Sequence, residues 1–414
     1  MSDVKRKAEL AASAKQKLIR LTTEQKNEAL QCIANALGEQ SAQIFAANQK
    51  DLQHGKENGL SDSLLDRLAL NENRVAGMQE GIEQIISLPD PIGDEIETLQ
   101  PENGLNIKKV RVPIGVIGMI YEARPNVTID AIALGIKTGN AVILRGGSAA
   151  LYSNEQLVNT VKYALEQTNV PASCVQLVAD SDRQSVQDML KLNGLIDVII
   201  PRGGAGLINH VVQHATVPVI ETGAGICHTY IDREANVEMA TNIVMNAKVQ
   251  RPSVCNAMET LLVHEDFAQE HLLSILEAYR QAGVELRGCN RTKTLLPSVK
   301  EATDTDWDTE YNDYILSIKI VNHMDEAITH IHQHGTMHSE CIVTDNQAHA
   351  ATFLQQVDAA AVYHNASTRF TDGFEFGFGA EIGISTQKLH ARGPMGLHAL
   401  TSSKYTIYGT GQTK

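Results

Sequence analysis

The sequence predicts an α/β protein with two parallel-sheet domains, and three observations lead to this prediction. Short apolar runs alternate with helical stretches between Gly115 and Tyr363, as in sheets whose two faces are both covered by helices. The alternation restarts after Gly225, which indicates a second sheet. The chain has 414 residues, enough for two or three domains that each bury a core.

The first stretch, from Val4 to about Leu88, is predicted to form three helices. Asn58-Gly59 should interrupt it, and Pro89-Asp-Pro91 should end it. Its apolar residues recur at spacings near three and four, as on one face of a helix; they include Leu10, Leu18, Leu30, Ile33, Leu37 and Ile44.

A β-hairpin is predicted next, because two extended runs between Glu95 and Val112 flank the turn sequence Pro101-Glu-Asn-Gly104. At the end of the chain, Lys404–Tyr408 alternates like an edge strand. Both elements lie outside the α/β units, so they either pair with another subunit or cap their own sheets.

Each α/β unit is predicted to contain five strands separated by helices. In the first unit the strands are Val116–Ile120, Ala141–Leu144, Val175–Val178, Asp197–Ile200 and Val217–Ile220. In the second unit they are Ile226–Ile231, Glu259–Val263, Ile315–Val321, Cys341–Thr344 and Ala360–Tyr363.

Composition argues against several classes of protein. Lys and Arg total 35 against 49 Asp and Glu, and this net charge of −14 does not suit nucleic acid as the main partner. The chain lacks a signal-peptide pattern and any apolar run of about 18 residues, so we expect no membrane partner. Its six cysteines form no C-x-x-C pair, which argues against a zinc ribbon and favours reduced thiols in the cytoplasm.

Cys255 is the candidate nucleophile. It follows the polar stretch Arg251-Pro-Ser253, predicted to be loop, and precedes an apolar strand. Substrate can reach a thiol at such a position, and backbone N–H groups there lower its pKa and hold a developing oxyanion. The alternative is a small buried hydrophobe, the interpretation given to Cys32, Cys174, Cys289 and Cys341.

Other candidate site residues follow the strands of the first unit. Asn126 stands where a parallel strand ends, and its amide can donate to a carbonyl oxygen that becomes an oxyanion; alternatively it is a helix N-cap. Two glycine-rich turns could bring backbone N–H groups and an arginine to a phosphate, although neither matches the full G-x-G-x-x-G pattern. These turns contain Arg145, Gly146, Gly147 and Ser148, and Arg202, Gly203 and Gly204.

Four histidines, His330, His332, His334 and His338, invite a metal interpretation. No carboxylate or cysteine stands at a matching ligand spacing, and Gly335 should end their helix. A solvated stripe without metal is therefore predicted, with His338 free to turn toward a site.

These segments, in this order, resemble the aldehyde dehydrogenase superfamily. The motifs that carry the resemblance are Gly139–Arg145, Glu221-Thr-Gly-Ala-Gly225 and the later Cys255. Longer strings are similar to a branch that reduces an acyl phosphate; they are Tyr121–Thr128, Val249–Ala257, His338–Thr344, Asn365–Gly373 and Gly379–Pro394. Ser253 and His364 depart from that pattern without removing a catalytic group.

The resemblance implies three parts: a cofactor-binding domain, a catalytic domain and a β oligomerisation element that makes a homo-oligomer. The cofactor-binding domain would comprise residues 1–98 and 113–224, and the catalytic domain residues 225–370. The oligomerisation element would comprise residues 99–112 and 371–414.

The resemblance also implies a reaction, the NADPH-dependent reduction of L-glutamyl 5-phosphate to L-glutamate 5-semialdehyde in proline biosynthesis. Cys255 would form a thioester and Asn126 would hold the oxyanion. Arg145 and the Gly146-Gly147 turn would contact the cofactor. Glu221 activates water in oxidising relatives; a phosphate-releasing enzyme has no such step, so here it would only shape the cofactor site.

The substrate is anionic, so its site needs cations. Arg124, Arg251 and Arg369 are the candidates, with Arg392 behind them; for each the alternative is a salt bridge.

Competing interpretations are a hydrolytic NAD(P)-dependent aldehyde dehydrogenase and a scaffold that kept only the fold. Because the chain has no second nucleotide-binding region, a glutamate kinase that makes the acyl phosphate would be a separate, transient partner.

Overall fold

The computed structural model describes residues 2–122, 124–180 and 182–414, which divide into two compact units. Unit 1 runs to Thr222 and also contains Gly377–Gly383 and Met395–Lys414. Unit 2 comprises Gly223–Phe376 and Ile384–Pro394. Residues 371–414, predicted to belong to a single element, are thus divided between the two units.

Unit 1 begins with five helices where three were predicted. Thr22 explains the first additional break, because its side chain and that of Gln25 form a capping box that starts a new helix. Leu10, predicted to face the core, is 40% exposed. The helices are α1 (Asp3–Leu18), α2 (Thr23–Glu39), α3 (Ser41–Glu57), α4 (Asp62–Leu68) and α5 (Glu72–Ser87).

The sheet of unit 1 contains four parallel strands in the order β5-β4-β3-β6. The strands are β3 (Val116–Tyr121), β4 (Ala141–Gly146), β5 (Val175–Leu177) and β6 (Val198–Arg202). The helices that follow them are α6 (Asn126–Lys137), α7 (Leu151–Leu165), α8 (Arg183–Leu190) and α9 (Ala205–His214), with 3-10 turns at Ser148–Ala150 and Ala172–Cys174. The predicted fifth strand is reduced to one bridge between Ile199 and Val219.

The strand order reverses between β3 and β6, because β4 and β5 continue on one side of β3 whereas β6 pairs with its other side. Ligands of open α/β sheets bind at the carboxyl ends of strands beside such a reversal. The loops after β3 and β6 are therefore the expected binding loops of unit 1.

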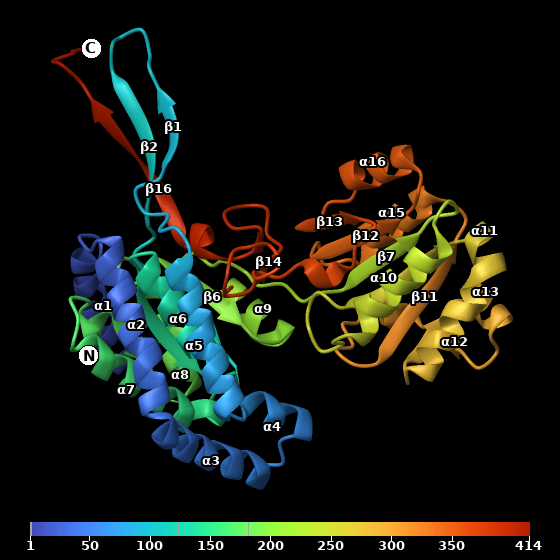
Figure 1. Cartoon of the computed structure of the whole chain (residues 1–414), viewed down its shortest axis with the longest axis horizontal. Coiled ribbons are helices and arrows are strands. Elements are labelled where there is room, and N and C mark those ends of the chain that lie inside the picture. Colours follow the sequence, from blue (N-terminus) through green and yellow to red (C-terminus); the bar gives the residue numbers. More distant parts are fainter. Residues whose placement is uncertain (1, 123, 181) are drawn as a thin grey trace. The chain divides into compact units, whose positions relative to one another are not determined.

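Three antiparallel strands form an arm that extends away from the helices of unit 1 (Figure 1). They are β1 (Glu95–Leu99), β2 (Asn106–Pro113) and β16 (Thr401–Tyr408), preceded by the 3-10 turn Leu397–Leu400. The predicted hairpin between Glu95 and Val112 is confirmed, and its first strand lies before residue 99, where the oligomerisation element was expected to begin. As expected, β16 is an edge strand.

Unit 2 contains a seven-stranded parallel sheet in the order β10-β9-β11-β8-β7-β12-β13. Its strands are β7 (Cys227–Ile231), β8 (Met258–His264), β9 (Glu285–Gly288), β10 (Lys300–Glu301), β11 (Ile315–Val321), β12 (Ser339–Val343) and β13 (Ala361–His364). Its helices are α10 (Val237–Val249), α11 (Glu265–Phe267), α12 (Leu273–Gln281), α13 (Asn290–Leu295), α14 (Asp304–Trp307), α15 (Met324–His334) and α16 (Gln347–Gln356). Shorter elements are a π-turn at Ala268–Leu272, a 3-10 turn at Thr368–Phe370 and the strand pair β14 (Ile384–Ser385) and β15 (Gly393–Pro394).

Two apolar cores lie on the sheet of unit 2. One packs α10 and α12 on the sheet through residues such as Val244 and Leu276, and the other packs α15 and α16 through Ile331 and Phe353. With both faces covered, five of the strands carry runs of apolar residues that were recognisable in the sequence, whereas the short polar strands β9 and β10 were not predicted. Within the described part of the chain, no helix is long and apolar enough to cross a bilayer.

Candidate active site

Cys255 lies in a loop between α10 and β8, at the amino edge of the unit 2 sheet, and we call residues 250–257 the Cys255 loop. The predicted loop position before an apolar strand is confirmed. The residue Cys255 is partly exposed, whereas Cys174, Cys227 and Cys341 are buried. Cys255 is therefore accessible within its own unit in a way that these three cysteines are not.

The Cys255 loop is pinned to the segment 368–371. The amide Nδ2 of Asn256 donates to the carbonyl oxygens of Arg369 and Thr371 at 3.2 and 2.9 Å, and the Thr368 hydroxyl donates to the Asn256 carbonyl at 2.8 Å. Since Asn256 is buried, these bonds anchor the residue next to Cys255.

The carbonyl oxygen of Cys255 contacts residues at the start of β7. The Cys227 thiol donates to it at 3.2 Å, and a Cβ built on Gly225 would stand 1.5 Å from it. Only a residue without a side chain fits at position 225, which gives the last glycine of the Glu-x-Gly-x-Gly motif a physical reason.

Cys227 is a neighbour that the sequence did not reveal. Burial, then the negative charges of Glu340, Cys255 and Glu259, raises the pKa of its thiol, so it remains a neutral donor. His338 has Nδ1 at 3.7 Å from the Cys227 sulfur and at 2.8 Å from the Ser339 hydroxyl. His338 is thus turned toward the inner side of the Cys255 loop.

Two of the three candidate substrate arginines lie beside this loop. Arg369 donates from Nε to Gln250 at 2.8 Å, and Arg251 is exposed. Burial and the charge of Arg251 lower the pKa of Arg369, whereas Asp372, Cys255 and Cys227 oppose this shift. Arg251 is part of the Cys255 loop and Arg369 is hydrogen-bonded to it, so two cations lie near Cys255, a setting that favours a thiolate and an anionic ligand.

Asn126 is the first residue of α6 and is exposed in unit 1. It is not the N-cap, since Pro125 takes that position; its amide donates instead to the Asp130 carboxylate at 3.2 Å. Burial raises the pKa of Asp130 to about 7, against the opposing effects of Asn126 and Arg202. The i, i+4 spacing could have revealed this partner.

The first glycine-rich turn stands at the carboxyl end of β4. A Cβ on Gly146 would lie 2.2 Å from the Asn154 amide, whereas Gly147 is partly exposed and Ser148 is exposed. The Arg145 guanidinium is largely buried and donates to the carbonyls of Gly146 and Asp182 at 3.0 and 3.4 Å. Burial lowers the pKa of Arg145.

The second turn, Gly203-Gly204, stands at the start of α9 and contacts a carboxylate. The Gly204 N–H donates to Glu122 at 3.1 Å, and a Cβ on Gly203 would overlap the same side chain. This end of the helix therefore does attract an anion, but a phosphate there would have to displace Glu122. Arg124 follows β3 and is partly exposed, and Glu221 is partly exposed near Thr222, where the first segment of unit 1 ends.

The groups at the carboxyl edge of unit 1 fit a nicotinamide dinucleotide. The fit rests on the Gly146-Gly147 turn at the carboxyl end of β4, the adjacent Arg145, and the position of the loops beside the strand-order reversal. These residues would hold the phosphates and a ribose.

Comparison with known proteins supports this description. Residues 1–303 match the model of the aldehyde dehydrogenase family. The chain belongs to the aldehyde dehydrogenase family. This makes it an oxidoreductase that acts on an aldehyde and uses a nicotinamide cofactor.

Its relatives are named gamma-glutamyl phosphate reductases. Those of Halalkalibacterium halodurans and Desulforamulus reducens are 57% and 58% identical over 415 and 414 residues, and each match covers 100% of both chains. The crystal structure of the Thermotoga maritima protein of that name has a TM-score of 0.98 and 48% identity, with 100% of both chains covered.

The prediction of a solvated stripe of histidines is wrong at His330. His330 is 1% exposed and packs against Trp307 and His228. Burial lowers its pKa, so the ring is neutral. The helix is amphipathic, and position 330 faces the core while His332 faces solvent.

Three further predicted residues need correction or comment. Cys32 is partly exposed and not a buried hydrophobe, because it lies on the polar side of α2. Cys289 is partly buried at the N-cap position of α13 and packs against the apolar core of unit 2. For Arg392 the alternative applies: it forms an ion pair with Asp358 at 2.7 Å, and Lys388 pairs with the same carboxylate.

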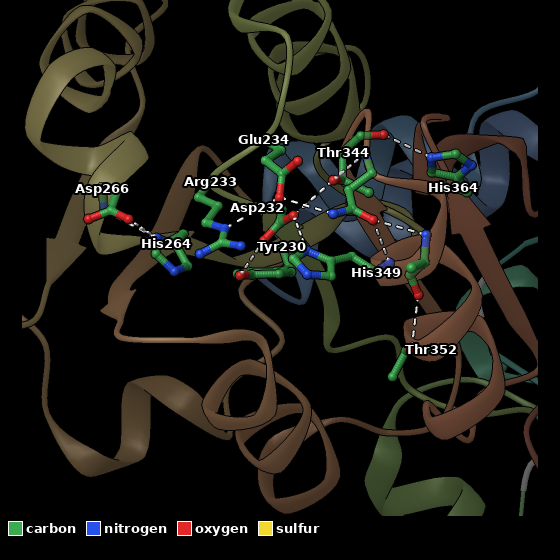
Figure 2. Close-up of polar contacts among 12 residues, drawn as sticks. Tyr230, Asp232, Arg233, Glu234, His264, Asp266, Thr344, His349, Thr352 and His364 are labelled. Atoms are coloured by element: carbon green, nitrogen blue, oxygen red, sulfur yellow. Dashed lines mark hydrogen bonds and ion pairs between the residues drawn. The ribbon is translucent and has the colours of Figure 1, made fainter.

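A second polar cluster lies at the opposite, carboxyl edge of the unit 2 sheet (Figure 2). Buried Asp232 accepts hydrogen bonds from Tyr230 at 3.0 Å and Thr344 at 2.8 Å, and its carboxylate lies 2.7 Å from Nδ1 of His349. Glu234 is close enough that the three groups could hold a metal. Because both Asp232 oxygens already take part in hydrogen bonds, we describe the cluster as a polar link between β7, β12 and α16.

Proposed function

We propose that the protein reduces L-glutamyl 5-phosphate to L-glutamate 5-semialdehyde with NADPH and releases phosphate, a step of proline biosynthesis. The names of relatives at 57% and 58% identity support this substrate. The single observation that carries the chemistry is a partly exposed Cys255 beside Arg251 and Arg369.

In the first half of the reaction, the Cys255 thiolate attacks the acyl carbon of the substrate. Phosphate is a stable anion, so it leaves with little help from an acid, and a thioester forms. Arg251 and Arg369 supply the positive charge that the carboxylate and phosphate groups require. Arg124 is the third proposed contact.

In the second half, the thioester carbon accepts a hydride, which a bound reduced nicotinamide supplies. The oxyanion on that carbon takes hydrogen bonds from the Cys255 backbone N–H and from the proposed second donor Asn126. Collapse of this thiohemiacetal releases the aldehyde and returns the thiol. No water attacks the thioester in this reaction. Glu221 therefore has no water to activate, and its role is to shape the cofactor site.

The preference for NADPH is proposed from the biosynthetic direction of the reaction and from Arg145. An arginine beside the Gly146-Gly147 turn can pair with a ribose 2′-phosphate, which NADH lacks. Its present hydrogen bonds to backbone carbonyls would then be rearranged.

We also propose three features of the cellular setting. Exposed apolar residues on β1 and β16 suit a homo-oligomer formed by the arm; they are Ile96, Leu99, Tyr405, Ile407 and Tyr408. A separate glutamate kinase would deliver the labile acyl phosphate. The third feature is a cytoplasmic location, where the six free cysteines would remain reduced.

The test follows the reaction in reverse. Glutamate semialdehyde is supplied with NADP or NAD, in the presence and absence of phosphate, and cofactor reduction is recorded. We expect turnover only with phosphate or arsenate, faster with NADP, and none in Cys255→Ser. Turnover without phosphate would instead establish the hydrolytic alternative, and an active Cys255→Ser variant would refute the thioester.

A further inference from the structure

A buried ion pair joins the two ends of the Cys255 loop. Lys248 is in the last turn of α10 and Glu259 is the second residue of β8, so one partner precedes the loop and the other follows it. The Lys248 ammonium lies 2.5 Å from Oε2 of Glu259, and the two side chains are 0% and 1% exposed. The loop is thus closed at its base by two charges shielded from water.

The second carboxylate oxygen of Glu259 links the ion pair to the segment 310–312. Oε1 accepts a hydrogen bond from the Asn312 N–H at 3.1 Å, and Asn312 has the unusual positive φ of 55°. Two residues earlier, Glu310 accepts from the Gly225 N–H at 2.9 Å. Gly225 is the residue packed against the Cys255 carbonyl, so the segment supports the loop from two directions.

Stability alone does not account for this pair. Removing two charges from water is expensive, and apolar residues of similar size often stabilise a core as well or better. A buried pair that is also hydrogen-bonded can, however, fix one conformation of the backbone around it.

We propose that Lys248 and Glu259 are positioning residues that hold the Cys255 loop in its reactive conformation. This inference rests on the proposed function, in which Cys255 is the nucleophile. Neither residue is assigned a contact with substrate; both act through the loop backbone and through Asn312.

The groups around Lys248 and Glu259 make the strength of their ion pair dependent on pH. Burial raises the pKa of Glu259 to about 7 and lowers that of Lys248, while their mutual attraction opposes both shifts. The other charged or titratable groups that act on the pair are Glu310, Asp313 and Cys227, and the Tyr311 ring lies 5.9 Å from the Lys248 ammonium. As the pH falls below this value, Glu259 gains a proton and the ion pair is lost.

The test uses the full-length protein with Glu259→Gln, Lys248→Gln and the double variant. For each, kcat, KM and the rate of Cys255 alkylation by iodoacetamide are measured per folded molecule. Because misplacement by about 1 Å can reduce a rate roughly 100-fold, we expect kcat and the alkylation rate to fall about 10- to 100-fold, with KM changed less than about threefold. The double variant, which can keep an amide hydrogen bond, should recover part of the loss.

Asp232→Asn is the matched control. Asp232 is a buried, hydrogen-bonded carboxylate of the same sheet, but it lies at the carboxyl edge, away from the Cys255 loop. We expect this variant to lose thermal stability while kcat and the alkylation rate remain within about twofold of the wild type.

Two comparisons decide the outcome. The alkylation rate of the wild type relative to Glu259→Gln should approach one as the pH falls well below 7, because the wild type then carries the same uncharged group. Variants that unfold more easily yet keep wild-type kcat and alkylation would overturn the positioning role. If Glu259→Gln does not fold, Lys248→Gln is judged by the same criteria. An active Cys255→Ser variant would overturn the proposed function instead, whatever the pair does.

Discussion

Asp130 is a single carboxylate whose proton links folding to pH. Burial raises its pKa to about 7, and an unfolded Asp titrates near 4. The folded protein therefore binds more protons than the unfolded chain between about pH 4 and pH 7. The stabilisation from this group is complete below that interval and is lost as the pH rises through it.

We expect Asp130→Asn to remove this pH dependence. The unfolding temperature of the wild type, measured against that of the variant by calorimetry, should fall as the pH is raised from about 5 to about 8. Glu72→Gln, an exposed carboxylate of α5, controls for the loss of one negative charge. A constant difference between wild type and Asp130→Asn over this interval would contradict the prediction.

The residues of the site differ in how far the sequence could reveal them. Cys255 was predictable because a polar Pro-Ser stretch ended at an apolar strand. Asp130 was in principle predictable from its helical spacing to Asn126. Cys227 and Glu259 were not, because only the pairing of β7 with β8 and the closing of the loop bring them to Cys255.

At the scale of elements, the turn that leads into β7 depends on a residue without a side chain. A Cβ at Gly225 would stand 1.5 Å from the Cys255 carbonyl oxygen, so Gly225→Ala must displace one of the two backbones. Since the reactive geometry tolerates little displacement, we expect kcat and the Cys255 alkylation rate to fall by about 100-fold. Circular dichroism should show an unchanged helix and strand content.

Gly81→Ala in α5 serves as the control for Gly225→Ala, because alanine fits at position 81. Gly81 is in a helix interior, and nothing lies within 4 Å of the Cβ it would gain. Alanine loses less conformational freedom on folding, so we expect the free energy of unfolding to rise by about 0.5–1 kcal/mol with unchanged kcat. Urea denaturation measures the first quantity; a decrease there would contradict the expectation.

The elements themselves were predicted unevenly, for physical reasons. Strands such as β3 and β4 were recognised because burial on both faces gives them runs of apolar residues. The helices of unit 1 were harder to count because Thr22 starts a new helix inside one apolar periodicity. Position 330 was misplaced because a histidine pattern does not tell which side of α15 faces the core.

At the scale of the whole molecule, the arm of unit 1 is the feature that bears on assembly. Its strand β16 pairs on one side only, with β2, and leaves Tyr405, Ile407 and Tyr408 more than half exposed. An edge strand with such side chains offers hydrogen bonds and apolar area to another chain, and monomeric proteins generally protect edges of this kind. A second copy of the same chain, bound through the arm, would cover the unpaired backbone edge and the exposed apolar side chains of β16.

We therefore expect Ile407→Lys to weaken self-association. The substitution places a charge on the edge strand, where it would lose water on association, and edge lysines commonly prevent strand pairing. Tyr163→Lys is the matched control, because Tyr163 is a similarly exposed apolar residue on α7, outside the arm. Sedimentation velocity at several concentrations should show a smaller species for Ile407→Lys alone; an equal loss in both variants, or in neither, would exclude the arm as the oligomer contact.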